Sequence, residues 1–423
     1  MSELLNARDR RTSMIRNLLL SYPLIIAIKP NTPGENKQTK EAYVLTRIFF
    51  NYIKTIYTIK NQIFLDEGEG PIFLFCLEGY DALIVKNRLV DVEDMHPLGR
   101  FIDLDVYDTH TSISRIDLGY PHRKCFICQE DAYMCSRSQK HTLLELNIYI
   151  VKSVRDYMKW FITTVIDESM IRELELEYKF GCVTKTTCGS HPDMNYEMMI
   201  KAKHAILPFL CDIFFLAYDG SDKSDMLLKA RKIGKRAEQA MLLATDGVNA
   251  YKGLIFIVGF LLLGIGSELS HHILSMNIFD QIKDLSQPVF ADFNKDDQTF
   301  GLHAYHTYHI RGARGEVLDG FPTLQEMIHK YPYQHPIDDT TLRQILIDII
   351  ILAEDTVLLK RSKDLKSYSS FKEKLKVLNS NCLDEVIKLN TYAIKHHLSV
   401  GGSADLLVAY MCLQTYLNDF HTN

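Results

Sequence analysis

The sequence predicts a multidomain protein with an α+β amino-terminal domain over residues 1–155 and a mainly all-α domain over residues 156–423. The first observation is length, because 423 residues exceed one typical domain of roughly 100–200 residues. The second is pattern. Short apolar runs alternate with helical spacing in the first part, whereas from about Leu143 apolar residues recur every three or four positions. We expect no flexible linker at the boundary.

The amino-terminal domain is predicted to begin with a helix over residues 4–20, followed by a strand in "PLIIAIKP" at 23–30. "NTPGENK" then supplies the proline and glycine of a turn. A helical run extends from Glu41 to about Lys60, and "PIFLFCLEG" at 71–79 and "GRFIDLDVYD" at 99–108 have the composition of strands. Helices and strands mixed in this way are typical of an α+β domain.

Two carboxylates lie two positions apart in the last of these strands. Side chains alternate across a strand, so Asp103 and Asp105 share one face while Ile102 and Leu104 point to the other. Like charges are costly to bury together, so the pair either faces water or holds a cation. An Asp-x-Asp strand is one way to hold Mg²⁺ against a nucleoside triphosphate. Arg100 is then either a phosphate clamp or the partner of a neighbouring acid.

A cysteine cluster follows in "RKCFICQEDAYMCSRSQKH" at 123–141. Cys125 and Cys128 form a C-x2-C pair, and Cys135 and His141 follow at spacings that four-coordinate Zn²⁺ accepts. The alternative is a set of reduced thiols packed in a core. The spacing therefore predicts a zinc site without excluding plain cysteines.

The second domain is predicted to be helical from its runs at 143–168, 225–245, 342–361 and 403–417. The apolar run "GLIFIVGFLLLGIG" at 253–266 is shorter than the roughly 18 residues of a membrane span, so we expect a buried core helix. Glycine-rich turns precede apolar segments at "GVNAYKG", "IRGARGE" and "SVGGSAD". Such loops suit a phosphate-rich ligand, although simple helix caps have the same composition.

Composition bounds the function class and the compartment. A net charge of −5 without a Lys/Arg-rich tract argues against a nucleic-acid binder. The amino-terminal run "LLLSYPLIIAI" resembles a signal peptide, but Glu3 and Asp9 precede it and no small-residue cleavage site follows. The nine cysteines then fit reduced thiols. We expect a cytoplasmic protein that binds neither a membrane nor nucleic acid.

The ordered segments "NTPGENK", "GRFIDLDV", "SRIDLG", "RKCFIC" and "AYMCSR" resemble the CitX family, the holo-acyl-carrier-protein synthases of citrate lyase. The resemblance implies a nucleotidyltransferase-like domain that moves a phosphoribosyl-dephospho-CoA group onto a serine of the apo-citrate lyase acyl carrier protein, with release of pyrophosphate. Related malonate decarboxylase enzymes depend on the matching aspartates. By that analogy the resemblance places Mg²⁺ on Asp103 and Asp105, with catalysis depending on both.

The segments "GSHPDMNY", "RKIGKRAEQAMLLAT", "GVNAYKG", "GARGE", "GFPT" and "GGSADLL" resemble the CitG family, the triphosphoribosyl-dephospho-CoA synthases. The family joins ATP to 3'-dephospho-CoA and releases adenine. The resemblance implies that catalytic groups come from His191, Asp193 and Glu316. It implies that substrate and phosphate are bound by Asn249, Lys252, Arg314 and Asp405.

A chain with both halves is expected to make and attach the citrate lyase prosthetic group, as CitXG fusions do. The CitG-like half departs from its family at several positions: Thr184 replaces an aspartate, Tyr251 replaces a histidine, and "DTVLLKRSK" keeps Asp355 and Arg361 without the usual asparagine and two glycines. Two alternatives stay open. The helical half is a non-catalytic nucleotide-binding or docking module, or the acceptor is the malonate decarboxylase carrier protein.

Overall fold

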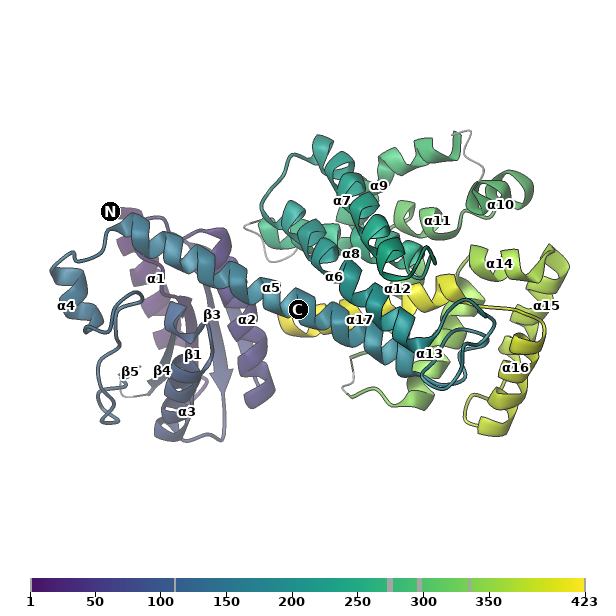
Figure 1. The fold of residues 1–423 in the computed structure, drawn as a ribbon. Coiled ribbons are helices and arrows are strands. Elements are labelled where there is room, and N and C mark those ends of the chain that lie inside the picture. Colours follow the sequence, from purple (N-terminus) through teal and green to yellow (C-terminus); the bar gives the residue numbers. More distant parts are fainter. Residues whose placement is uncertain (1, 110–111, 272–276, 295–298, 334–335, 422–423) are drawn as a thin grey trace. The chain divides into compact units, whose positions relative to one another are not determined.

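The computed structural model describes residues 2–109, 112–271, 277–294, 299–333 and 336–421. These residues form two compact units. Unit 1 contains the chain up to Trp160 and the end of the last helix from Leu417, and unit 2 contains most of residues 161–416. Unit 1 contains both strands and helices, and the described residues of unit 2 are helical or irregular (Figure 1). The predicted order, an α+β part followed by a mainly helical part, is confirmed.

Unit 1 is built from the following elements: α1 (Ser2–Leu18), β1 (Leu24–Pro30), α2 (Lys40–Ile56), β2 (Asn61–Glu67), β3 (Gly70–Leu77), α3 (Ala82–Met95), the 3-10 turn η1 (Gly99–Phe101), β4 (Ile102–Asp108), β5 (Ser112–Ile113), α4 (Ala132–Arg137) and the first part of α5 (Leu143–Glu175). The strands form one sheet in the order β2-β3-β1-β4-β5. All described pairs in it are antiparallel.

The two faces of this sheet are covered by different helices. On one face, Ile15 of α1 packs with Ile25 and Ala27 of β1 and with alternate residues of β3. On the other, Phe50 of α2 lies with its ring 4.3 Å from that of Phe73 on β3, and α3 packs against β4. The alternating pattern of β4 follows from this arrangement, because its apolar residues face α2 and α3. Asp103 and Asp105 lie on the face of α1.

Helices α3 and α4 and strand β5 were not predicted from the sequence, and two further details of unit 1 differ from the prediction. The helix expected to reach Lys60 ends at Ile56, and strand β2 was not predicted. Strand β2 lies at the edge of the sheet with one face exposed. Its polar residues outnumber its apolar ones, so the pattern is too weak to read from the sequence.

Unit 2 contains the rest of α5 and the following elements: α6 (Tyr196–Tyr218), α7 (Lys223–Ala244), α8 (Lys252–Ser270), α9 (Ile278–Ser286), the 3-10 helix η2 (Gln287–Asn294), α10 (Phe300–Tyr308), α11 (Gly312–Leu318), α12 (Pro322–Lys330), α13 (Asp339–Leu352), α14 (Thr356–Ser362), α15 (Leu365–Lys376), α16 (Leu383–Lys395) and α17 (Gly401–Phe420).

Helix α8 is the centre of the core of unit 2, packed against α6, α7 and α9. Among the described helices it alone is long and apolar enough to cross a membrane, but 83% of its most apolar window is buried inside the protein. Close packing is possible because a Cβ on Gly266 would lie 2.5 Å from the backbone oxygen of Phe214 in α6. The prediction of a buried core helix at 253–266 is confirmed.

Candidate functional site

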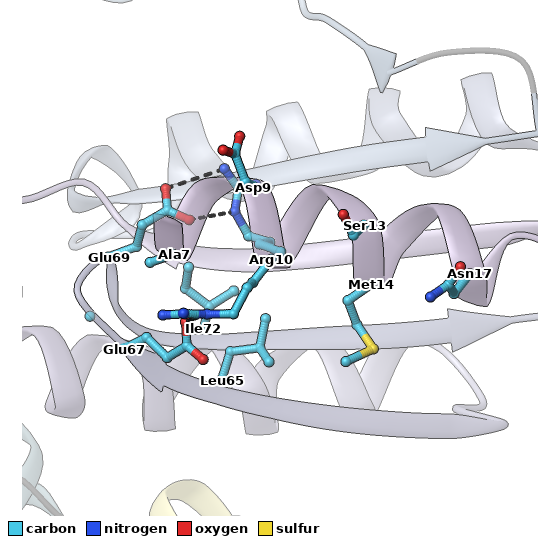
Figure 2. A pocket seen from close by; sticks show the side chains of 12 residues that line it. Ala7, Asp9, Arg10, Ser13, Met14, Asn17, Leu65, Glu67, Glu69 and Ile72 are labelled. Atoms are coloured by element: carbon cyan, nitrogen blue, oxygen red, sulfur yellow. Dashed lines mark hydrogen bonds and ion pairs between the residues drawn. The ribbon is translucent and has the colours of Figure 1, made fainter. Parts of the chain in front are cut away.

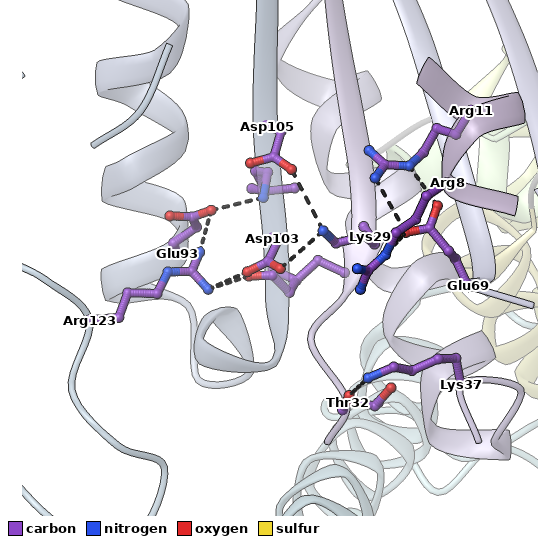
Figure 3. A network of polar contacts seen from close by, with 12 residues as sticks. Arg8, Arg11, Lys29, Thr32, Lys37, Glu69, Glu93, Asp103, Asp105 and Arg123 are labelled. Carbon is purple, nitrogen blue, oxygen red and sulfur yellow. Dashed lines mark hydrogen bonds and ion pairs between the residues drawn. The ribbon is translucent and has the colours of Figure 1, made fainter. Parts of the chain in front are cut away.

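The two aspartates of β4 and a lysine of β1 are the centre of a polar network on unit 1 (Figure 3). Lys29 is the cross-strand partner of Asp103. Its Nζ lies 3.5 Å from Asp103 Oδ2 and 3.9 Å from Asp105 Oδ2. The side chains of Asp103 and Asp105 are 27% and 37% exposed. The pair therefore reaches solvent and also holds a positive charge between its carboxylates.

Arg123 approaches the same network from the segment after β5. Its guanidinium donates to Asp103 Oδ1 at 2.8 Å and to the carbonyl oxygen of Ile102 at 2.9 Å, and it forms an ion pair with Glu93 of α3. The Glu93 side chain is only 3% exposed, and it also accepts the backbone N–H of Leu104 at 2.8 Å. Burial acts to lower the pKa of Arg123, but Glu93 and Asp103 outweigh it and raise that pKa. The guanidinium is firmly charged.

A groove of about 950 Å³ shares Arg123 and Glu93 with this network. Its basic lining residues are Lys37, Arg100, Arg115, Arg123 and Lys124. Three buried atoms of lining residues have no hydrogen-bond partner among the described residues: Thr32 Oγ1, Arg115 Nε and His141 Nε2. Because a buried polar atom without a partner costs free energy, Thr32 Oγ1 and Arg115 Nε indicate that the groove receives a polar ligand. The positive lining favours an anionic one.

The positive lining extends from the groove toward the aspartates. A smaller hollow of about 180 Å³ shares Thr32 and Lys37 with the groove and is also lined by Arg8, Lys29 and Asp103. Burial lowers the pKa of Lys37, and the charges of Arg8 and Lys29 lower it further. An ammonium group among other cations gains stability when an anion binds beside it. A multiply charged phosphate chain meets that condition.

Arg100 and Arg115 occupy the groove wall in different ways. One terminal nitrogen of Arg100 donates to the carbonyl oxygens of Lys124 and Cys125, so this guanidinium holds the cysteine-containing segment rather than an acid. Arg115 binds Asp94 at 2.8 Å, with the acid half exposed. The phosphate-clamp role predicted for Arg100 stays a prediction, and Arg123 is the arginine that contacts Asp103.

The four predicted zinc ligands lie together at the edge of the same groove. One ligand atom from each of Cys125, Cys128, Cys135 and His141 can be chosen so that all four lie within 4.8 Å of one another. The sulfur of Cys135 is 3.4 Å from that of Cys125 and 4.0 Å from that of Cys128. Burial opposes ionisation of Cys125, but the backbone N–H groups of Cys128 and Ile127 and the neighbouring thiols lower its pKa.

A third hollow of unit 1, of about 360 Å³, lies between α1 and strands β2 and β3 (Figure 2). Four of its charged side chains form ion pairs with one another. Arg10 lies 2.6 Å from Glu67, and Arg11 lies 2.8 Å from Glu69. These ion pairs attach α1 to the turn between the two strands, so this hollow shows structural pairing rather than groups available for chemistry.

Unit 2 has its own candidate site, a pocket of about 190 Å³ lined by residues from α5, α8, α14, α17 and the loops before α6, α8 and α17. Four of the predicted residues line it: His191, Asn249, Lys252 and Asp405. Asn249 accepts the backbone N–H of Lys252 at the start of α8, at 3.2 Å. Lys252 Nζ lies 3.0 Å from Glu238 at the exposed rim. The positive amino-terminal end of α8 therefore opens on the pocket.

His191 is held by hydrogen bonds on both ring nitrogens. Its Nδ1 lies 3.0 Å from the Arg361 guanidinium and its Nε2 lies 2.8 Å from Ser399 Oγ. A guanidinium only donates, so Nδ1 accepts and the ring proton lies on Nε2. Burial and the charge of Arg361 lower the pKa of His191, and Asp193 opposes them. The imidazole is therefore neutral at neutral pH and donates to Ser399.

Asp405 reaches the start of α8 at a point where only glycine fits. A Cβ built on Gly253 would lie 2.2 Å from Asp405 Oδ2. Burial raises the pKa of Asp405 well above its ordinary value, and the carboxylates of Glu173 and Asp355 raise it further. Asp355 itself caps α14 and accepts from Ser403 N and Oγ, each at 2.8 Å. A cation or a positively charged reacting group beside Asp405 would therefore favour its ionised form.

Two further groups of the pocket were not among the predicted site residues. Glu173 is buried and lies 2.5 Å from Lys179. The Tyr251 hydroxyl is buried without a hydrogen-bond partner among the described residues, and burial raises its pKa well above the ordinary value, with Glu173 and Asp405 adding to the effect. The pocket therefore combines the Glu173 carboxylate, the Asp405 carboxyl group with its raised pKa, and a phenol without a hydrogen-bond partner among the described residues.

The structure does not bring three of the predicted residues into this pocket. Asp193 is exposed on the loop before α6. The Arg314 guanidinium lies 5.9 Å from the ring centre of Phe293. Glu316 is buried and accepts the Thr323 hydroxyl at 2.5 Å near the start of α12. Glu316 thus has a local structural partner, and its place in the chemistry stays a prediction.

Sequence reasoning missed the groups that depend on contacts between distant segments. Lys29 lies in an apolar strand and Glu93 in an amphipathic helix, so neither carries a local signal. Glu173 lies inside the long helix α5. Arg361 and Ser399 lie near recognisable motifs but were not assigned a role. These residues could be found only by knowing that β1 pairs with β4 and that α5 packs near α17.

Comparison with protein families covers nearly the whole chain. Residues 1–157 match the model of CitX, described as apo-citrate lyase phosphoribosyl-dephospho-CoA transferase. Residues 159–421 match the model of CitG, described as ATP:dephospho-CoA triphosphoribosyl transferase. The two matches meet near the boundary between the two units.

Curated relatives contain the same two parts. The chain is 29% identical over 451 residues to the protein CitXG of Leuconostoc mesenteroides, which covers 96% of this chain and 95% of that protein. It is 27% identical to the protein CitXG of Haemophilus influenzae, over 96% of this chain and 93% of that protein. A 2-(5''-triphosphoribosyl)-3'-dephosphocoenzyme-A synthase of Haemophilus ducreyi is 26% identical, covering 66% of this chain and 96% of that protein.

Proposed function

Because the chain belongs to the CitX family over residues 1–157 and to the CitG family over residues 159–421, we propose that unit 2 makes a triphosphoribosyl donor and that unit 1 transfers it. The chain is a transferase of citrate lyase prosthetic-group biosynthesis and a fusion of both families. The proposed first reaction joins ATP to 3'-dephospho-CoA and releases adenine. The proposed second reaction attaches phosphoribosyl-dephospho-CoA to a serine of the apo-citrate lyase acyl carrier protein and releases pyrophosphate.

The observation that carries the transfer proposal is the positively lined groove beside Asp103. In the proposed reaction the serine oxygen attacks the α-phosphorus of the donor, and the bond from that phosphorus to the pyrophosphate breaks. Lys37 and Arg123 lie where they could bind phosphate oxygens, since both line the groove and Lys37 also lines the smaller hollow. The protein's main task is to position the phosphates and neutralise their charge.

The aspartate pair suits a hard cation. Two carboxylates on one strand face, each partly exposed, supply the oxygen ligands that Mg²⁺ prefers. We therefore propose that Asp103 and Asp105 hold Mg²⁺ together with the donor. When bound, the ion supplies charge neutralisation at the phosphates. Lys29 already lies against both carboxylates, so its ammonium is placed to turn toward the phosphates.

In unit 2 the proposed reaction is displacement of adenine at the anomeric carbon of the ATP ribose by the 2'-hydroxyl of dephospho-CoA. Positive charge develops on that ribose as the bond to adenine breaks. Glu173 and Asp405 line the pocket, and the raised pKa of Asp405 means that a developing cation would stabilise its ionised form. The start of α8, with Asn249 and Lys252, is proposed to bind phosphate.

The departures from the CitG family do not remove all acidic groups from this region. The hydroxyl of Thr184, which replaces a family aspartate, donates to Glu177 at 2.9 Å. Thr186 donates to the same carboxylate oxygen at 2.8 Å. A carboxylate thus lies beside the altered position, which supports an active unit 2 over a non-catalytic module.

Two assays on the full chain test the proposal. Adenine release from ATP and 3'-dephospho-CoA with Mg²⁺ reports on unit 2, and the mass gained by the carrier protein reports on unit 1. We expect Asp405→Asn to abolish adenine release while supplied donor is still transferred. Asp103→Asn and Asp105→Asn should do the reverse. Asp91→Asn, on the exposed side of α3, is the matched control and should leave both activities intact.

The outcomes also separate the remaining alternatives. Transfer of supplied donor without any adenine release would leave unit 2 as a non-catalytic binding or docking module. A mass gain on the malonate decarboxylase carrier protein but not on the citrate lyase carrier would change the acceptor. Normal transfer by folded Asp103→Asn and Asp105→Asn variants at limiting Mg²⁺ would disprove the metal role.

A further inference from the structure

The segment between β5 and α5 contains four potential metal ligands but little regular secondary structure. Its described regular structure is one isolated bridge between Lys124 and Asp131 and the short helix α4. Cys125 and Cys135 are nevertheless 5% and 4% exposed. The segment has no large apolar core of its own, so an interaction other than apolar packing must keep these two thiols buried.

The spacing of the sulfur atoms matches tetrahedral coordination. Zinc–thiolate bonds of about 2.3 Å at tetrahedral angles place sulfur atoms about 3.8 Å apart. The distances from the sulfur of Cys135 are 3.4 Å to Cys125 and 4.0 Å to Cys128, on either side of that value. A disulfide needs about 2.0 Å, and it would use only two of the three sulfurs.

A fourth ligand is available in His141. A ring nitrogen of His141 lies within 4.8 Å of the ligand atoms of all three cysteines. His141 Nε2 is buried without a hydrogen-bond partner among the described residues. In the spacing C-x2-C-x6-C-x5-H, all four ligands come from one segment of 17 residues. Three sulfurs and one imidazole are the donor set of a closed structural zinc site, because no position is left for water or substrate.

We propose that Cys125, Cys128, Cys135 and His141 bind one structural Zn²⁺, and that this ion fixes the wall of the transfer groove. The three thiols lose their protons on binding, so the centre carries one net negative charge. Arg100 donates to the carbonyl oxygens of Lys124 and Cys125.

The position of the cluster explains why it would affect the transfer site. Arg123 lies two residues before the first ligand and binds both Asp103 and Glu93. Arg100 joins the adjacent residues Lys124 and Cys125 to the turn before β4. A metal that fixes the segment therefore fixes the arginine that contacts the first aspartate. The ion acts by positioning the segment, because its four protein ligands leave no coordination position for the substrate.

The first test uses the wild-type full chain purified without added metal or chelator. We expect about one zinc per chain by elemental analysis. Replacement by Co²⁺ should give the visible ligand-field bands and near-ultraviolet thiolate charge-transfer bands of a tetrahedral site. Alkylation followed by mass spectrometry should find Cys125, Cys128 and Cys135 protected, and a strong chelator should expose them together. A chain without metal, whose cobalt form lacks these bands, would overturn the proposal.

The second test places the metal. Cys128→Ser and Cys135→Ser should each lose the zinc, whereas Cys188→Ser, an exposed thiol of unit 2, should retain it. His141→Cys should keep a four-ligand site and shift the cobalt spectrum toward four-thiolate coordination. Zinc retained at full stoichiometry by Cys128→Ser and Cys135→Ser would place it elsewhere and refute the assignment, whether or not the variants fold well.

The third test concerns positioning. Removing the zinc should raise the KM for the donor in the transfer assay by at least several-fold and leave adenine release by unit 2 unchanged. An unaltered KM after complete metal loss would refute the positioning role.

Discussion

Replacement of Arg123 by methionine should destabilise unit 1 strongly, because one guanidinium serves two carboxylates. Arg123 binds Glu93 and Asp103, and methionine keeps much of the apolar stem while removing the charge. The Glu93 carboxylate is 3% exposed, so water cannot replace the lost partner. Among the described residues, the backbone N–H of Leu104 is the other donor to it.

The magnitude follows from burial. Removing one partner of a fully buried ion pair costs about 3–5 kcal/mol. Arg123 is 22% exposed and Asp103 is 27% exposed, so part of the interaction is screened, and we expect a loss of about 2–4 kcal/mol. That corresponds to roughly a 30- to 900-fold change in an unfolding equilibrium. Arg115→Met is the matched control, because its partner Asp94 is 50% exposed and the expected loss is about 0–1 kcal/mol.

The assay is amide hydrogen exchange on the full chain, with the peptide that contains Leu104 as the reporter. This amide donates directly to Glu93, and β4 is a central strand of the sheet. In Arg123→Met its protection should fall by the factor above, and Arg123→Met combined with Glu93→Gln should recover part of it. Equal protection in Arg123→Met and Arg115→Met would refute the reasoning from burial.

Two further predictions concern unit 2. Gly253→Ala should slow adenine release by about 10- to 100-fold, because the added Cβ would displace the Asp405 carboxylate. Gly234→Ala is the control, because the atom nearest its added Cβ would be 3.9 Å away. Equal rates of adenine release by the two variants, measured by chromatography, would contradict this prediction. Arg361→Met should raise the pKa of His191, since the removed cation helps to lower it. A titration of the ring by NMR measures this shift, and an unchanged or lower pKa would count against the proposed contact.

The sequence contained the parts of unit 1 that depend on local pattern. The alternation around Asp103 and Asp105 placed both on one strand face, and the C-x2-C spacing identified the cluster that the fold brings together. The charged partners of these aspartates could not be predicted from the sequence. Lys29 meets Asp103 only because β1 pairs with β4 in one register, and a strand register between residues 74 positions apart has no local signal.

In unit 2 the motifs identified the pocket incompletely. "GVNAYKG" and "GGSADLL" mark the starts of α8 and α17, and the structure brings these two helix ends together around Gly253 and Asp405. "GARGE" looked equally promising, yet its Glu316 binds Thr323 instead of entering that pocket. Motifs at helix ends cannot show which ends meet. That depends on the packing of the whole helical core, and Glu173 came from the interior of a helix for the same reason.

The cation already present between the two aspartates has a consequence for metal binding. Lys29 Nζ lies within 4 Å of both carboxylates, so a divalent ion entering alone would meet a positive charge. With a triphosphate present, the ammonium gains a new partner and the repulsion falls. We therefore expect Mg²⁺ to bind weakly to the free chain and much more tightly with the triphosphoribosyl donor.

Lys29→Met separates these effects. It should strengthen Mg²⁺ binding by the free chain, since two carboxylates lose their internal cation, and weaken binding of the donor, which loses a phosphate contact. Titration calorimetry with Mg²⁺ alone and with donor measures both. Lys60→Met is the matched control, because its ammonium lies 4.0 Å from Glu78 at the exposed surface. If Lys29→Met weakened Mg²⁺ binding in both titrations, Lys29 would serve to hold the aspartates in place rather than to occupy the metal position.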